Sequence, residues 1–273
     1  MTVPAVLVQL SDCHIVRRGQ RLDGRIDTPG FLAEAVRAVQ ALPTMPDAVL
    51  VSGDLVDAGD AQEYAHLREL LAPLPCPVWL MPGNHDAVPA LKAAFTDHAY
   101  LHAPDAAMAP FAQHVHTLGR WRVVTLDTVV PGAPHGALCA TRLRWFDETL
   151  AQAPDAPTLV AMHHPPFQTG IAHMDAMGLR EGGEALAQVI GRHPQVRRIV
   201  CGHLHRSIVG TFAGVSALTV PSTAHQIVLD WRGDGPAAWR AEPPGFAVHL
   251  LYDDGRIVSH IAASGDWGPA QPF

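Results

Sequence analysis

Short apolar runs recur along the chain, and polar residues follow each of them. Four nearly continuous apolar runs cover residues 5–10, 48–51, 78–81 and 158–162. Such runs are typical of strands that are buried on both faces of a parallel sheet. Between the first two runs, residues 31–42 carry apolar side chains at helical spacing, which predicts an amphipathic helix. The pattern therefore indicates alternating strands and helices.

The same periodicities predict the remaining elements. Further helices are expected at 62–71, 89–95, 141–150 and 184–190. Near residue 114 the rhythm changes, because two apolar strands flank Gly119-Arg120, a hairpin signal with which a second sheet begins. The strands expected from there on, apart from 158–162, are 114–118, 121–127, 198–201, 207–212, 215–220, 226–229, 247–252 and 256–261. Residues 230–245 are rich in Gly and Pro and are predicted to form an irregular surface loop.

These elements predict an α/β fold with two packed sheets and helices outside them. We expect a single domain over residues 1–273, because no internal repeat or low-complexity linker divides the chain. From about residue 207 the pattern is rich in strands and loops, and this C-terminal extension is expected to form a cap or a subunit contact. Trp231, Trp239 and Trp267 in it could rim a pocket or an interface between subunits of a homo-oligomer.

Charge narrows the possible partners. The 273 residues include 19 Lys and Arg against 26 Asp and Glu, a net charge of −7. Binding to nucleic acid or to an anionic membrane is therefore not expected, because no excess of positive charge could neutralise a phosphate backbone. No apolar run approaches the roughly 18 residues of a membrane span, and the first ten residues lack a signal-peptide pattern. We expect a soluble, cytoplasmic protein.

Residue types that bind metals follow five of the predicted strands. The five motifs are Asp12-Cys13-His14, Gly53-Asp54-Leu55-Val56-Asp57, Gly83-Asn84-His85-Asp86, His163-His164-Pro165-Pro166 and Gly202-His203-Leu204-His205. Sites in open α/β sheets form beyond the carboxyl ends of the strands, so the motifs can converge. The i, i+2 spacing within the first and last motifs would place two side chains on the same side of an extended segment.

The candidate ligands are more numerous than one ion needs. They are Asp12, His14, Asp54, Asn84, His163, His203 and His205. A bridging carboxylate would let these seven residues hold two ions with four ligands each. Oxygen and imidazole ligands favour Mn, Fe or Zn over Mg or Ca. Two ions about 3.5–4 Å apart favour displacement at phosphorus, so the pattern predicts hydrolysis of a phosphate ester.

In this order, from Asp12 to His205, the five motifs resemble the blocks of the calcineurin-like metallophosphoesterases. More narrowly, Arg18-Gly19, Gly24–Asp27, the His-His-Pro-Pro motif and Ser222–Gln226 resemble the class III cyclic-nucleotide and glycerophosphodiester phosphodiesterases. The resemblance implies a four-layer αββα sandwich. It also implies attack by a metal-bridging hydroxide on small phosphodiesters such as 3′,5′-cyclic AMP or glycerophosphodiesters. Asp54 would bridge one ion held with Asp12, His14 and His205 and another held with Asn84, His163 and His203.

Other polar residues of the motifs receive supporting roles. His85 is expected to contact the phosphoryl group or the leaving oxygen, the alternative being that it orients Asn84. Asp86 is predicted to be the partner that orients His85. Only one of two consecutive histidines can face the metals, and the resemblance selects His163, so His164 is predicted to lie behind the ligands. His225 is either part of the substrate pocket, as the resemblance implies, or an ordinary surface imidazole.

Two other functions remain open beside the phosphodiesterase. A phosphomonoesterase or nucleotidase would use the same chemistry, whereas the charge argues against a nuclease. A metal-binding scaffold without catalysis is a different class, but such proteins usually lose ligands or the histidine after Asn, and all of these are present. No Arg or Lys lies within the five motifs, which favours a singly charged diester over a monoester.

Overall fold

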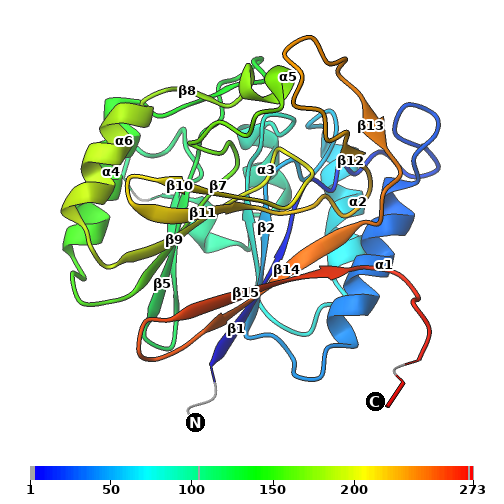
Figure 1. Ribbon diagram of the computed structural model, residues 1–273, viewed down its shortest axis with the longest axis horizontal. Helices are drawn as coiled ribbons and strands as arrows, with labels where there is room; N and C mark the ends of the chain where they lie inside the picture. Colours follow the sequence, from blue (N-terminus) through cyan, green and yellow to red (C-terminus); the bar gives the residue numbers. More distant parts are fainter. Residues whose placement is uncertain (1–3, 104, 270, 273) are drawn as a thin grey trace.

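Two mixed β-sheets packed face to face form the centre of the molecule in the computed structural model, which describes residues 4–103, 105–269 and 271–272 (Figure 1). The first sheet has the order β15-β14-β1-β2-β3, formed by Ile257–Ala263, Gly245–Leu251, Ala5–Leu10, Ala48–Ser52 and Val78–Met81. The second has the order β10-β11-β9-β7-β5-β4, formed by Ile208–Phe212, Val215–Thr219, Val196–Cys201, Thr158–Met162, Trp121–Leu126 and His114–Leu118.

The central strands of both sheets run parallel, as their continuous apolar sequences predict. In the first sheet Val8 of β1 lies opposite Val49 of β2, and in the second Val124 of β5 lies opposite Val160 of β7. Antiparallel strands lie at the edges: β14 and β15 in the first sheet, β4 and β10 in the second. The carboxyl ends of the parallel strands therefore open toward one edge of the sandwich.

Helices cover the outer face of each sheet. The first sheet packs against α1 (Thr28–Gln40), α2 (Ala61–Leu71) and α3 (Val88–Ala94), and the second against α4 (Ala140–Ala151) and α6 (Gly183–Arg192). Between the sheets, Leu7 and Leu50 of the first contact Val123 and Leu159 of the second in a third buried cluster. The predicted four-layer αββα sandwich is confirmed.

The boundaries differ from the predicted ones where capping or short pairing decides them. Helix α1 begins at Thr28, three residues early, because the Asp27 carboxylate accepts a hydrogen bond from Gly30 N and Pro29 favours the first turn. Four short elements escaped the sequence pattern, since each spans too few residues to show a period. They are η1 (Ala99–Leu101), β6 (Gly136–Ala137), α5 (Ala172–Asp175) and β8 (Leu179–Glu181).

The segment from 230 to 245 is less irregular than predicted, whereas the strand predicted at 226–229 is shorter than expected. Strand β12 (Gln226–Ile227) pairs with β13 (Trp239–Arg240), which lies inside the stretch predicted to be a loop. In Figure 1 this orange segment stands beside the blue loop that follows β1. The other strands beyond residue 207 extend the two sheets at their edges: β10 and β11 belong to the second sheet, β14 and β15 to the first. Within the described ranges, no helix is long and apolar enough to cross a membrane.

A cluster of histidines fills the space between the edge strands β3 and β4. His114 and His116 lie against the Tyr100 ring at 4.5 and 4.8 Å, and His116 stacks on Trp79 at 4.0 Å. Nδ1 of His98 lies 2.7 Å from the Tyr100 hydroxyl. Burial lowers the pKa of His114 to about 3 and that of His116 to about 4, because a charged ring would lose its hydration there.

Acid is therefore expected to destabilise the fold below about pH 6.5. A histidine of the unfolded chain takes up a proton near that pH. His114 and His116 stay neutral in the fold down to about pH 3 and 4, so the unfolded state binds more protons in between. His116→Phe keeps an aromatic ring on Trp79. In this variant the unfolding free energy should fall less steeply as the pH is lowered, and the change in slope should correspond to up to about one proton. Urea unfolding of the metal-free protein from pH 7 to 4 measures this, with the exposed His102→Gln as control. An unchanged slope in His116→Phe would contradict the prediction.

Candidate metal centre

The five motifs meet at the edge where the carboxyl ends of the parallel strands lie. Backbone hydrogen bonds join the loops: Asp12 N donates to Gly53 O at 3.1 Å and His14 N to Asp54 O at 2.9 Å. His203 N donates to the Asp12 carboxylate at 2.9 Å, which connects the loop after β9 in the second sheet to the loop after β1 in the first. The centre is thus assembled from both sheets.

The backbone of these loops is left-handed. Seven described residues other than glycine have a positive φ, and five of them are predicted ligands: Asp12, His14, Asp54, His203 and His205. This conformation is unfavourable for residues with a Cβ, and strain of this kind concentrates at functional sites. The expectation that Asp12 with His14, and His203 with His205, share one side of an extended segment is therefore wrong. Their side chains converge through tight turns.

Glycine is required where two of the turns touch other parts of the centre. Gly53 has a φ of +95°, and a Cβ there would lie 2.3 Å from His163 Nδ1. A Cβ on Gly202 would lie 2.2 Å from Ser11 Oγ. Any side chain at either position would push the loops of the two sheets apart.

One group of ligand atoms comes from Asp12, His14, Asp54 and His205. The Nε2 atoms of His14 and His205 lie 3.1 Å apart, and Nε2 of His205 lies 3.5 Å from Asp12 Oδ1. Nδ1 of His205 donates to His225 O at 2.9 Å, which leaves the Nε2 lone pair directed at the group.

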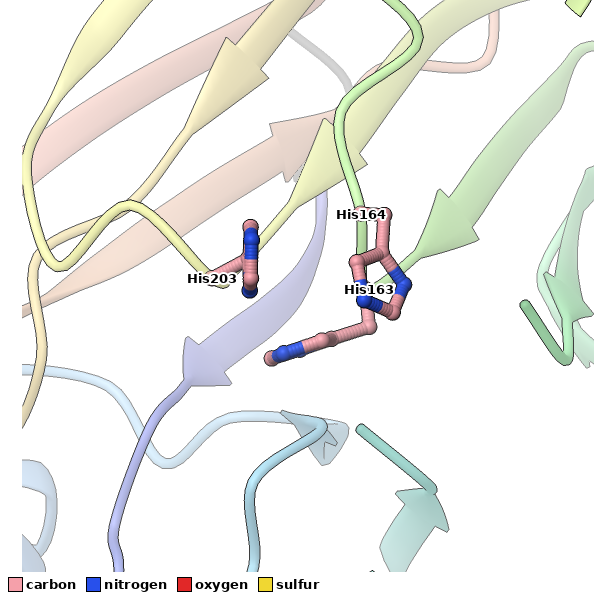
Figure 2. A group of neighbouring side chains, drawn as sticks. All are labelled: His163, His164 and His203. Atoms are coloured by element: carbon pink, nitrogen blue, oxygen red, sulfur yellow. The ribbon is translucent and has the colours of Figure 1, made fainter. Parts of the chain in front are cut away.

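A second group lies next to the first, around His163 and His203. Figure 2 shows their rings reaching from the ends of β7 and β9 toward a common space. Nδ1 of His163 donates to Ser52 O at 2.9 Å, so its Nε2 is free to accept. Asp54 joins the two groups, because its Oδ2 lies 3.3 Å from His163 Nε2 and 3.6 Å from His14 Nε2. Asn84 is half-buried and lines the same cavity.

His164 lies beside His163 and His203 and could offer a ligand atom with them (Figure 2), but both of its ring nitrogens have hydrogen-bond partners. Its Nε2 donates to Pro134 O at 3.2 Å, and its Nδ1 accepts from the Thr128 hydroxyl at 2.7 Å. Burial lowers the pKa of His164 well below its ordinary value, and the neighbouring His203 adds to this. A neutral ring with both nitrogens bonded supports its neighbours and has no lone pair left for an ion.

The centre has the features of a site built for cations. Several buried side-chain polar atoms have no hydrogen-bond partner among the described residues, and five of them belong to predicted ligands: Asp12 Oδ2, Asn84 Oδ1, His163 Nε2, His203 Nε2 and His14 Nδ1, the last of which lies 3.4 Å from the Asp57 carboxylate. Unpartnered buried polar atoms are rare because each costs the desolvation of that atom. Metal ions would satisfy the first four of these atoms, and the oxygen and imidazole donors suit Mn, Fe or Zn.

The ligands differ in their electrostatics, and for His163 the effect of burial is overcome by Asp54 and Asp12, which raise the pKa of this ring to about 9. Burial raises the pKa of the Asp12 carboxyl. For Asp54 the effect of burial is overcome by His163 and His14, which hold the pKa of this carboxyl well below its ordinary range. Burial lowers the pKa of His203 and of His205 to about 3, so both rings are neutral near pH 7. Neutral imidazole and ionised carboxylate are the forms that bind metals.

His85 stands at the exposed side of the centre, with 40% of its side chain accessible. Its ring lies 4.6 Å from that of His14, and its Nδ1 donates to Asp57 O at 2.8 Å. The Asp57 carboxylate is 3.4 Å from the same Nδ1 and also 3.4 Å from His14 Nδ1. Burial alone would lower the pKa of His85, but Asp57 and Asp54 raise it to about 10.

The prediction that Asp86 orients His85 is wrong. The Asp86 carboxylate is buried and accepts hydrogen bonds from Leu55 N, Gly83 N and the Tyr64 hydroxyl. It fixes the loop that carries Asn84 and His85, whereas Asp57 contacts the imidazole of His85. The sequence contained the signal, because Asp57 is the last residue of the Gly-Asp-x-x-Asp motif.

His225 lies at the centre, although its motif is far along the chain. Its ring is 4.6 Å from that of His205 and 5.7 Å from that of His14. It lines a cavity of about 400 Å³ that we call the metal cavity. This cavity is lined by His14, Leu22, Asp23, Asp54, Asp57, Asn84, His85, Pro134, Met174, Met177, His203, His205, His225 and Ile227.

The buried side-chain amide of Gln9 connects the two sheets that carry the ligands. Gln9 of β1 donates through Nε2 to Ser52 Oγ at 2.8 Å and to Cys201 O of β9 at 3.2 Å. Ser52 O in turn accepts the hydrogen bond from His163. Because the ligands come from both sheets, this bridge helps to fix their separation.

Comparison with known proteins agrees with the motifs. Residues 5–207 match the family model described as calcineurin-like phosphoesterase. The chain is 31% identical to the probable glycerophosphodiester phosphodiesterase GpdQ of Arcobacter nitrofigilis, over 98% of this chain and 96% of that protein. It is 32% identical to a 3′,5′-cyclic-nucleotide phosphodiesterase of Nostoc sp., over 95% and 92%. It is 30% identical to the 3′,5′-cyclic adenosine monophosphate phosphodiesterase CpdA of Escherichia coli K12, over 95% and 90%.

The fold is shared with solved structures. A dimetal phosphatase from Danio rerio superimposes with a TM-score of 0.72 at 15% identity, over 97% of this chain and 98% of that chain. That identity shows the common fold alone. The family match, by contrast, spans most of the chain, and the curated relatives are matched over nearly their whole length. This chain therefore belongs to the calcineurin-like phosphoesterases.

Proposed function

We propose that this protein is a dinuclear metal-dependent phosphodiesterase that hydrolyses small phosphodiesters, either cyclic nucleotides or glycerophosphodiesters. The position of Asp54 carries the proposal, because one carboxylate oxygen lies within 3.6 Å of histidines from both ligand groups. The relatives named as phosphodiesterases of these two substrate classes support it. A cytoplasmic location and a complement of Mn, Fe or Zn are part of the proposal.

The proposal divides the ligands between two ions. Asp12, His14 and His205 would hold one ion, Asn84, His163 and His203 the other, and Asp54 would bridge both. The contacts support this division, since His14 Nε2 lies 3.1 Å from His205 Nε2 and 3.6 Å from Asp54 Oδ2, while His163 and His203 belong to a separate group. When bound, two such ions supply charge for the phosphoryl oxygens and activate water for the displacement.

The remaining side chains would bind and protonate the substrate. Asn84 and His225 face the metal cavity and would orient the phosphodiester. His85 would donate a proton from Nε2 to the leaving alcohol oxygen as the bond from phosphorus to that oxygen breaks. Its Nδ1 is held by Asp57 O, so Nε2 is the ring nitrogen available for this role.

A phosphodiester should be hydrolysed with higher kcat/KM than the matching monoester. A monoester carries nearly two negative charges, and sites for it usually add Arg or Lys. Among the described residues that line the metal cavity there is no Arg or Lys, whereas Asp23 adds a carboxylate. Arg206, which follows His205 in the chain, pairs instead with Glu242 at 2.8 Å. Kinetics on bis(p-nitrophenyl) phosphate and p-nitrophenyl phosphate, at one pH and with one metal, compare the two.

Asp23→Asn sharpens this test, because it removes a charge that repels the monoester more than the diester. The preference for the diester should narrow in this variant. A wild-type preference for the monoester would contradict the proposal and favour the phosphomonoesterase alternative.

A further inference from the structure

A second cavity adjoins the metal cavity at His225. It has a volume of about 520 Å³, and we call it the aromatic cavity. Its walls come from the loop after β1, from α1 and from the C-terminal segment. The aromatic residues and arginines among them are Arg21, Arg25, Phe31, Trp239 and Trp267. His225 lines both cavities, so whatever occupies one lies next to the occupant of the other.

The aromatic rings of this cavity are accessible and close to the metal centre. Trp239 is 38% exposed and Trp267 is 66% exposed. The His225 ring lies 4.6 Å from that of the predicted ligand His205 and 5.6 Å from that of Trp239. Two ring contacts therefore separate a predicted metal ligand from an exposed indole. Accessible indoles beside a site offer flat surfaces for stacking.

Two arginines of the cavity wall can donate hydrogen bonds. Arg21 and Arg25 form no ion pair within the described part of the chain, whereas the nearby Arg17 and Arg18 pair with Asp60 and Glu69. Arg21 Nη1 donates to Arg25 O at 3.2 Å, and the other N–H groups of the two arginines can donate hydrogen bonds to acceptor atoms of a ligand.

One of the two carboxylates of the wall, Glu242, pairs with arginine, whereas the exposed Asp27 accepts one backbone hydrogen bond and forms no ion pair within the described part of the chain. Asp27 accepts from Gly30 N at the start of α1. Glu242 pairs with Arg206 at 2.8 Å and lies 3.7 Å from Arg240. A cationic head group such as choline would meet two guanidinium groups that form no ion pair, although Asp27 and the aromatic side chains of the wall could attract it.

We propose that the aromatic cavity binds the base of a nucleotide whose phosphodiester group lies in the metal cavity. A purine base is planar, stacks on indole and carries ring nitrogens that accept hydrogen bonds from Arg. In a 3′,5′-cyclic nucleotide only the ribose separates phosphorus from the base, which suits two cavities that share one histidine. The inference rests on the proposed function and selects cyclic nucleotides over glycerophosphodiesters, which have no planar group to stack.

The test compares two substrates in three proteins. We expect wild type to hydrolyse 3′,5′-cyclic AMP with higher kcat/KM than glycerophosphoethanolamine. Trp239→Ala should lower the ratio of kcat/KM for 3′,5′-cyclic AMP to kcat/KM for glycerophosphoethanolamine about tenfold, because it removes one base-stacking contact. Trp239→Phe should restore most of the ratio, because phenyl also stacks. Trp231→Ala is the matched control, since this tryptophan is 74% exposed in the same segment and does not line the cavity. An unchanged ratio in Trp239→Ala would overturn the proposal.

A binding experiment separates this proposal from the proposed function. Adenosine has no phosphate, so its binding does not depend on the metal centre. We expect it to quench tryptophan fluorescence of the metal-free protein in wild type and in Trp231→Ala, and much less in Trp239→Ala. Failure to hydrolyse any diester, with adenosine still bound, would refute the proposed function alone. Hydrolysis of diesters without adenosine binding would refute the aromatic cavity as a base site.

Discussion

Asp54→Asn is expected to abolish phosphodiester hydrolysis and to weaken binding of both ions. The variant keeps the shape of the side chain but removes the charge that faces His14 and His163. A metal ion contributes several kcal/mol to the stabilisation of a phosphoryl transition state. Because about 1.4 kcal/mol corresponds to tenfold in rate, the loss should exceed roughly 10³-fold. Activity on bis(p-nitrophenyl) phosphate across a Mn²⁺ titration measures it.

Thermal unfolding provides a second readout that does not depend on turnover. Mn²⁺ should raise the unfolding temperature of the wild type, because it binds the folded state alone. Asp54→Asn should lose most of this rise, and its metal-free form should unfold at a lower temperature than the metal-free wild type, because Asn loses the attraction of the Asp54 carboxylate to His163 and His14. The exposed Asp234→Asn is the control. Near-normal activity of Asp54→Asn at low Mn²⁺ would rule out a bridging role.

The convergence of the ligands could be predicted from the sequence because it follows from topology. Strands such as β1 and β7 read as continuous apolar runs, and continuous runs indicate buried parallel strands. Parallel strands end at a common edge, so Asp12 and His163 were placed near each other although 150 residues separate them. The two-sheet architecture followed from the change of rhythm at β4, the first strand of the second sheet.

The local geometry of the ligands could not be predicted in the same way. Asp and His carry no sign in the sequence that they adopt a left-handed backbone, and tertiary contacts such as that of His203 N with Asp12 hold them there. A similar cause explains why Asp57, and not the predicted Asp86, contacts the imidazole of His85. Asp86 is adjacent to His85 in the chain, but its carboxylate is drawn to Tyr64, which α2 brings from 22 residues away. Packing between helix α2 and the loop that carries Asp86 therefore determines the hydrogen-bond partner of that residue.

The C-terminal segment shows the limit of periodicity. Strand β13 spans two residues, too few for an alternating pattern to be recognised, whereas its partner β12 lies within the strand predicted at 226–229. Their pairing nevertheless brings Trp239 to the side of His225. The sequence left open whether the tryptophans rim a pocket or an interface, and the structure places Trp239 and Trp267 at a cavity.

His85→Ala should lower turnover of an unactivated diester by about 10²–10⁴-fold, the usual worth of a general acid. Asp57 and Asp54 favour the protonated ring of His85, while the cations of a loaded centre would bring its pKa back toward neutrality, where proton transfer is efficient. Both ions should stay bound, because His85 is exposed and lies outside the two ligand groups joined by Asp54. Metal analysis of the purified variant checks this.

Esters with different leaving groups distinguish between the two possible roles of His85, proton donation and binding of the phosphoryl oxygens. p-Nitrophenolate leaves without needing a proton, so the loss in His85→Ala should shrink strongly on bis(p-nitrophenyl) phosphate and remain large on 3′,5′-cyclic AMP, whose alkoxide must be protonated. His85→Asn, which can donate a hydrogen bond but no proton, should follow His85→Ala. An equal loss on both esters, with rescue by His85→Asn, would instead mean that the imidazole binds the phosphoryl oxygens, because that contact is the same whichever alcohol departs.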